Sequence, residues 1–120
     1  MSLSEFLERL RRDPGSIEFD QSLALIDSLY AFTPTAFRNG SAQNAAGQNN
    51  GSCKLLAFGR LQGLTPAQML ACFGAYYRDD VLAHPDGTDH QNIRQFIRHG
   101  WDGVQFEAQP LSPLPAGHPG

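Results

Sequence analysis

A capping motif that occurs three times constrains the fold most, because each copy stands just before an amphipathic stretch. Ser2, Thr65 and Thr88 are each followed, three residues later, by Glu or Gln. In such a capping box the hydroxyl accepts from a backbone N–H of the first turn, and the Glu or Gln side chain accepts from the cap residue's own N–H. Pro66 occupies the first helical position after Thr65, where a missing N–H costs nothing. The motif therefore predicts three helix starts.

Apolar side chains recur every three or four residues behind each motif and in two further segments, as expected for helices with one buried face. Gly or Pro follows most of these segments, where it would end a helix. Five helices are expected: from Leu3 to near Pro14, from a cap at Asp20 to Tyr30, from Cys53 to Leu61, from Thr65 to a point before Pro85, and from Thr88 to Gly100.

Two other segments have the composition of short strands. Residues 31–40 are rich in Thr and Phe and end in an Asn-Gly turn pair, and residues 100–108 alternate apolar with polar side chains. The two segments could pair, and the polar segment between residues 40 and 51 is expected to be a loop. We predict one α+β domain over residues 1–108, mostly helical with about five helices and a small antiparallel β element. A Pro-rich flexible tail is expected over residues 109–120.

Length and charge exclude several classes of protein. A chain of 120 residues can bury a single core without a metal or disulfides. Its formal net charge of -3 gives no electrostatic reason to expect nucleic acid or an anionic membrane as a partner. Two cysteines are too few for a disulfide framework, so a reducing cytoplasm is expected, and no cofactor is indicated.

Cys53 is a candidate nucleophile, because a thiol at a helix N-terminus has a lowered pKa. A thiol-dependent hydrolase or transferase would use Cys53 with His90 or His99 as the base. About five residues around Cys53 also resemble the nucleophile loop of papain-like cysteine proteases. The alternative is an inert thiol at the start of a helix. Burial of Cys53, or the lack of a histidine near it, would exclude the enzyme.

Lys54 breaks a local rule, because a cation in the first turn of a helix opposes the helix dipole. We therefore expect a partner for it: Asp86, Asp89 or a bound anion. The neighbouring amides, Asn49 and Asn50 among them, would either form Asx-type turns or line a polar pocket beside the cysteine.

A second candidate site is the cluster His84, Asp86, Asp89 and His90, which places four potential metal ligands within seven residues. Zinc or another divalent ion could bind such a set, which would make the protein a metal-binding module. The spacing matches no standard motif, and a turn followed by a helix cap explains the same residues.

A third candidate is the basic face of the last helix. His90, Arg94 and Arg98 recur every four residues and share one face, which could bind an anion or a partner's carboxylate. Alternatively, the arginines pair with the chain's own aspartates on a solvated face. His99 and Trp101 stand at the exit of this helix, and Trp101 joins the candidate partner-binding residues.

Together these segments resemble the HopJ family, small bacterial proteins named as type III secretion effectors. The resemblance implies an α+β domain and, through the family's name, delivery into a host cell by a type III system; it brings no catalytic residues. We therefore expect a small soluble bacterial protein that acts by binding a protein or another ligand, in the bacterial cytoplasm or inside a host cell. The resemblance is carried by the segments FTPTAFRNG, NAAGQNNGSCKLLAF, LACFGAYYRDDVLAHPDGTDHQNIRQFIRHGW and GVQF.

Overall fold

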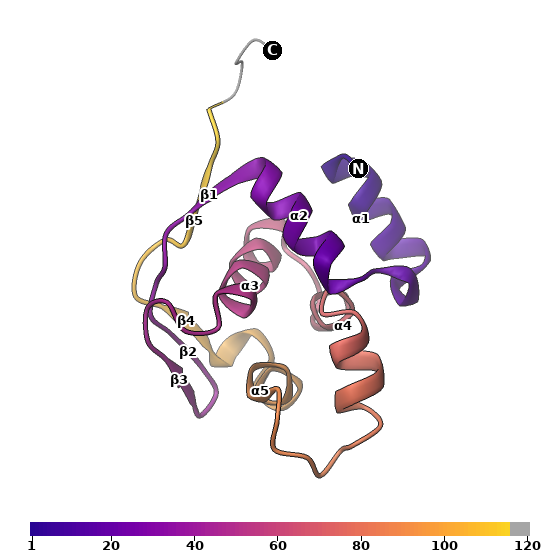
Figure 1. The fold of residues 1–120 in the computed structure, drawn as a ribbon, viewed down its shortest axis with the longest axis vertical. Helices are drawn as coiled ribbons and strands as arrows, with labels where there is room; N and C mark the ends of the chain where they lie inside the picture. Colours follow the sequence, from indigo (N-terminus) through magenta and orange to yellow (C-terminus); the bar gives the residue numbers. More distant parts are fainter. Residues whose placement is uncertain (116–120) are drawn as a thin grey trace.

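Helix α3, Asn50–Gln62, forms the centre of the molecule in the computed structural model, which describes residues 1–115. Every residue from Cys53 to Gly59 except Lys54 is buried, so α3 is covered on all sides. The other helices and the strands surround it (Figure 1). These are the helices α1 (Leu3–Arg12), α2 (Phe19–Leu29), α4 (Pro66–Ala71) and α5 (Gln91–His99), and the short turns η1 (Pro14–Ser16), η2 (Tyr76–Val81) and η3 (Gly100–Gly103).

Five short strands form two antiparallel sheets beside the helices. In the three-stranded sheet, β2 is central, with β3 on one side and β4 on the other. The pairing of Phe37 with Phe106 in β2 and β4 confirms the predicted contact between the two strand-like segments. The predicted loop after residue 40 contributes β3. The strands are β1 (Tyr30–Phe32), β2 (Phe37–Asn39), β3 (Ala42–Asn44), β4 (Val104–Phe106) and β5 (Leu111–Pro113).

A single hydrophobic core joins these elements. Phe6 of α1, Phe58 of α3 and Phe96 of α5 are all buried within it. The Phe6 and Phe58 rings meet edge to face with their centroids 6.0 Å apart. The predicted α+β class and its mostly helical content are confirmed. Within residues 1–115, no helix has the length and apolar character needed to cross a membrane.

Two of the three predicted capping boxes form. The hydroxyls of Ser2 and Thr65 accept from the backbone N–H groups of Glu5 and Gln68, and both side chains accept in return. The box predicted at Thr88 is wrong, because α5 begins two residues later, after His90. The cap predicted for α2 at Asp20 is also wrong, because α2 begins after Glu18, whose N–H donates to Gln21.

The prediction of one long helix after Thr65 is wrong, because the helix is interrupted at Gly74. This glycine has a φ of +62°, and a Cβ on it would lie only 2.7 Å from the backbone nitrogen of Phe19. The hydroxyl of Ser22 on α2 donates to the carbonyl of Cys72, just before the break. The close approach of α2 thus divides the predicted helix into α4 and the π-helical turn η2.

The domain continues beyond the predicted boundary at residue 108. Strand β5 pairs with β1, and Leu111 is 1% exposed in the core. The backbone N–H of Leu114 also donates to the carbonyl of Leu29. The prediction of a flexible tail from residue 109 is therefore wrong as far as residue 114, because apolar Leu111 anchors the segment. The rest of the predicted tail, residues 116–120, lies outside the described residues.

A candidate ligand-binding pocket

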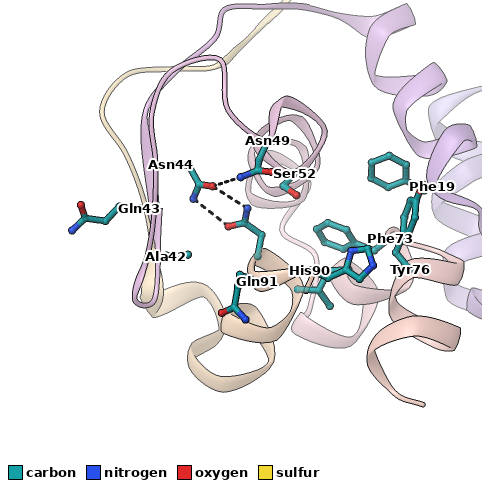
Figure 2. A pocket seen from close by; sticks show the side chains of 12 residues that line it. Phe19, Ala42, Gln43, Asn44, Asn49, Ser52, Phe73, Tyr76, His90 and Gln91 are labelled. Atoms are coloured by element: carbon teal, nitrogen blue, oxygen red, sulfur yellow. Dashed lines mark hydrogen bonds between the residues drawn. The ribbon is translucent and has the colours of Figure 1, made fainter. Parts of the chain in front are cut away.

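A pocket with a volume of about 590 Å³ lies where α2, β3, α3, η2 and α5 approach one another. Its volume lies within the usual range for small-molecule sites, about 300–1,000 Å³. Figure 2 shows aromatic rings on one side of it and amide side chains on the other. The pocket therefore has two chemically different walls, which come from distant parts of the sequence.

The aromatic wall consists of Phe19, Phe73, Tyr76 and His90. Phe19 stacks near Phe73 with 6.3 Å between ring centroids and meets Tyr76 edge to face at 5.1 Å. The ring of Tyr76 lies 5.2 Å from that of His90. These spacings make a continuous row of rings in contact. Tyr76 is 44% exposed, so it offers an open aromatic surface.

The polar wall rests on a network of asparagines. Asn44 and Asn92 each donate to the other's Oδ1, at 3.2 and 3.1 Å, and both are more than nine-tenths buried. Asn39 donates to the backbone carbonyl of Asn92 at 2.7 Å, and Asn49 donates to Asn44 Oδ1 at 2.7 Å. These bonds tie β2 and β3 to the starts of α3 and α5, and so fix the polar wall.

The backbone around the pocket is irregular. Asn49 and His90 are the only non-glycine residues with positive φ within residues 1–115, at +52° and +49°. Each is the residue before a helix, and neither caps it with its side chain. The π-helical turn η2 begins at Tyr76, also in the lining. Left-handed residues and π-helical turns both concentrate at functional sites.

The lining is almost free of charge. Among the described residues, none of those that line the pocket is Lys, Arg, Asp or Glu. His90 Nε2 lies 3.0 Å from Asp80 Oδ2 and 3.8 Å from Asp89 Oδ2, at the edge of the site. A hydrogen bond from the Arg94 guanidinium lowers the pKa of Asp89, so this carboxylate stays ionised.

The structure contradicts the predicted nucleophile. Cys53 is 1% exposed, and its Sγ lies 3.8 Å from the carbonyl oxygen of Thr35. Desolvation raises the pKa of this thiol to about 11, whereas a helix start alone would lower it. Cys53 does not line the pocket, although His90 does. The thiol-dependent enzyme that used Cys53 with His90 or His99 is therefore excluded.

Lys54 has a different partner from the one predicted. Its Nζ lies 2.8 Å from Asp27 Oδ1 on α2 and 5.1 Å from the centre of the Phe32 ring. These contacts offset the unfavourable position of the cation in the helix. The predicted pairing with Asp86 or Asp89 is wrong, because α2 supplies the nearer carboxylate.

The predicted metal site does not assemble. No group of three or more His, Cys, Asp or Glu side chains able to hold a metal ion occurs in residues 1–115. Asp89 binds Arg94 at 2.7 Å, and His90 faces Asp80. His84 and Asp86 belong to a turn that Arg94 holds through the carbonyl of His84. The proximity of the four residues in sequence thus reflects a clamped loop, and the metal prediction is wrong.

The basic face of α5 does not act as one surface. Arg94 is 7% exposed and donates to the backbone carbonyls of His84 and Asp89, so it stabilises the preceding loop. Trp101 donates to the carbonyl of Leu64 and packs against the core. Arg98 and His99 are exposed, but they border a different hollow from the pocket. Arg94 and Trp101 therefore make contacts within the domain, and partner binding by them stays a prediction.

The sequence predicted that Asn49 and Asn50 either form Asx-type turns or line a polar pocket beside Cys53. Asn49 lines a pocket that Cys53 does not reach, and Asn50 is exposed outside its lining. Neither Tyr76 nor Phe19 was among the predicted site residues, although both line the pocket. The available signal was the amide-rich segment itself, since polar side chains cluster where backbone or ligand groups need partners.

The class of protein defined so far is a small α+β domain with a pocket between the starts of α3 and α5. The comparisons with known proteins then identify its family. The HopJ type III effector protein family matches residues 3–111, so the chain belongs to this family. A crystal structure of VPA0580, described as a protein of unknown function, is similar with a TM-score of 0.93 and 52% identity over 95% of each chain. The comparison with curated proteins gave no match.

Proposed function

We propose that this HopJ-family protein acts by binding a small molecule in the pocket between the aromatic wall and the asparagine network. The observation that carries the proposal is convergence. Both left-handed non-glycine residues, Asn49 and His90, line one pocket with the first residue of the π-helical turn, Tyr76. These three residues are far apart in sequence, so no local capping rule brings them together.

The cost of this arrangement supports a binding role. A left-handed backbone costs about 1–2 kcal/mol for most residues, although Asn and His tolerate it better than others. Regular capping of α3 and α5 would avoid the cost, as it does at α1 and α4. The protein instead has a fixed polar wall and an open aromatic ring at one place, which is the arrangement of a ligand site.

A pocket-filling variant tests the proposal. Ser52 lines the pocket from α3, and Ser52→Phe would place a ring in it. We expect the low-molecular-weight fraction of a bacterial or host-cell extract to shift the amide NMR signals of Asn49, Tyr76 and His90. Ser52→Phe should abolish these shifts.

The matched control is Ser4→Phe, an exposed position on α1 outside the pocket. This variant should respond to the extract as the original protein does. Extracts that shift no pocket signal, or that shift them equally in Ser52→Phe, would refute the binding function.

Delivery into a host cell is a separate part of the proposal, and it is supported by the description of the family. Strains with and without a working type III apparatus should differ in the amount of the protein that they release. Equal retention in the two strains would contradict delivery and leave the pocket proposal intact. A host protein as an additional partner would follow only if delivery occurs.

A further inference from the structure

The chemistry of the two walls defines the class of ligand, provided that the pocket is the binding site proposed above. Three properties of the lining bear on it: its charge, the spacing of its rings and its unpaired polar atoms. Each excludes a different kind of small molecule.

The charge of the lining excludes an anionic ligand. A bound phosphate or carboxylate would find no Lys or Arg among the described lining residues, while Asp80 and Asp89 stand behind His90. An anion would therefore lose its hydration without gaining a counter-ion. An uncharged ligand avoids this cost.

Ring spacing excludes an aromatic cage for an ammonium group. In such a cage, several ring faces surround the cation. Here, Phe19 lies 5.1 Å from Tyr76, and Tyr76 lies 5.2 Å from His90, so neighbouring rings touch and leave no space between them. A row of touching rings with one exposed member, Tyr76, suits a flat ligand that stacks on it.

The polar atoms that remain define the edge of the ligand. Asn44 and Asn92 bind each other and are already satisfied. Within the described residues, the hydroxyls of Ser52 and Tyr76 and the Oδ1 atom of Asn49 have no hydrogen-bond partner in the protein, and all three residues line the pocket. The hydroxyls can donate or accept, and the carbonyl oxygen accepts. They match a ligand that carries both a donor and an acceptor.

We propose that the pocket binds an uncharged planar aromatic ring that carries an amide-like edge with a donor and an acceptor. The ring would stack on Tyr76 against the aromatic wall, and its edge would bind the free atoms of Asn49 and Ser52. The asparagine network would hold the Asn49 side chain in place before the ligand arrives, which reduces the entropy lost on binding.

Three small probes separate the properties that define this class. Benzamide is planar, uncharged and has the edge; benzoate keeps the ring but is charged; cyclohexanecarboxamide keeps the uncharged edge but is not planar. We expect benzamide to shift the amide NMR signals of Asn49, Ser52 and Tyr76, and each of the other two probes to bind about tenfold more weakly.

Two variants of one residue test the stacking. Tyr76→Leu removes the ring and should weaken benzamide binding about three- to tenfold, whereas Tyr76→Phe keeps the ring and should bind within about threefold of the original. Tyr76 is half exposed, so both variants are expected to fold, and thermal unfolding checks this.

The possible results distinguish the ligand class from the proposed function. Tighter binding of benzoate or cyclohexanecarboxamide than of benzamide would overturn the class. The class would also be overturned if an extract shifts the pocket signals but benzamide, added on its own, does not. If neither the probes nor the extracts shift any pocket signal, the binding function itself fails.

Discussion

Four of the five α-helices in residues 1–115, which are α1, α4, α3 and α5, form two pairs that begin in contrasting ways. Helices α1 and α4 begin with complete capping boxes at Ser2 and Thr65. Helices α3 and α5 begin after left-handed Asn49 and His90, which provide no side-chain cap. The first pair satisfies local rules and lies away from the pocket, while the second pair lines it.

This contrast separates helix starts that depend on local hydrogen bonds from helix starts that depend on tertiary contacts. Each capping box satisfies two backbone N–H groups with neighbours in sequence and needs no tertiary contact. The uncapped starts depend instead on the asparagine network, which holds Asn49 through Asn44 and joins Asn92, the second residue of α5, to β2 and β3. Local rules are broken where tertiary contacts replace them, and the candidate pocket lies there.

The largest effect should come from breaking the network that replaces the caps. Asn92→Ala removes the side chain that accepts from Asn44 and donates to Asn44 Oδ1, while Asn39 keeps its hydrogen bond to the backbone carbonyl of residue 92. Because an unpaired buried polar group costs about 1–3 kcal/mol and the buried Asn44 amide loses two bonds, we expect a loss of about 2–3 kcal/mol in the free energy of unfolding. Urea denaturation measures it.

Gln91→Ala is the matched control, because Gln91 is the adjacent residue on α5 but is exposed. It should change the free energy of unfolding by less than about 0.5–1 kcal/mol. Equal effects of the two substitutions would show that the network does not support the irregular helix starts.

The next effect concerns the left-handed backbone at His90. In His90→Val the β-branched side chain disfavours positive φ, whereas in His90→Asn the asparagine tolerates it. Both variants lose the imidazole and its contact with Asp80. We expect His90→Val to be about 1–2 kcal/mol less stable than His90→Asn in urea denaturation. Similar stabilities would mean that the start of α5 adjusts its backbone freely.

A smaller loss of stability should distinguish Thr65, whose capping box forms, from Thr88, whose predicted capping box does not. Thr65→Ala removes the hydroxyl that accepts from Gln68, and it should cost about 1 kcal/mol of unfolding free energy. Thr88→Ala should be within about 0.5 kcal/mol of the original, because α5 starts after His90. Thermal unfolding of the pair is sufficient. A loss at Thr88 as large as that at Thr65 would contradict the observed start of α5.

The sequence predicted those parts of the fold that depend on neighbouring residues. The starts of α1 and α4 follow from hydroxyl and Glu or Gln spacing, and the pairing of β2 with β4 follows from strand composition on either side. Thr88 carries the same spacing, but Arg94 clamps the loop before α5 through the carbonyls of His84 and Asp89. The contacts of Arg94 therefore place the start of α5 after His90, although the spacing of Thr88 and Gln91 is that of a capping box.

The pocket could be predicted only in part, since its walls depend on distant contacts. Asn39 and Asn92 are 53 residues apart, and no local pattern indicates that they share hydrogen bonds. Cys53 shows the opposite error: its place near a helix start was visible in the sequence, but its burial was not. A single sequence reveals which residues are polar or reactive more readily than which of them reach solvent.

The smallest effect on stability is expected at Cys53, the fourth residue of α3, where the helix end and burial act in opposite directions. Burial dominates and raises the pKa of the thiol from 9.0 to about 11, so its contribution to stability is fully present below pH 9 and is lost as the pH rises through about 11. At pH 8, about 100-fold less thiolate is present than in the unfolded chain, because the pKa difference is two units.

Alkylation with iodoacetamide at pH 8 should therefore label Cys53 at least about 100-fold more slowly in the folded protein than in urea. Cys72 reports independently, because burial raises its pKa to about 12. Cys53→Ala leaves that thiol alone and allows the two rates to be separated. Rapid labelling of Cys53 in the folded protein would mean that the uncapped start of α3 controls the thiol more strongly than burial does. An uncapped helix start would then also affect the reactivity of a cysteine in the first turn of the helix.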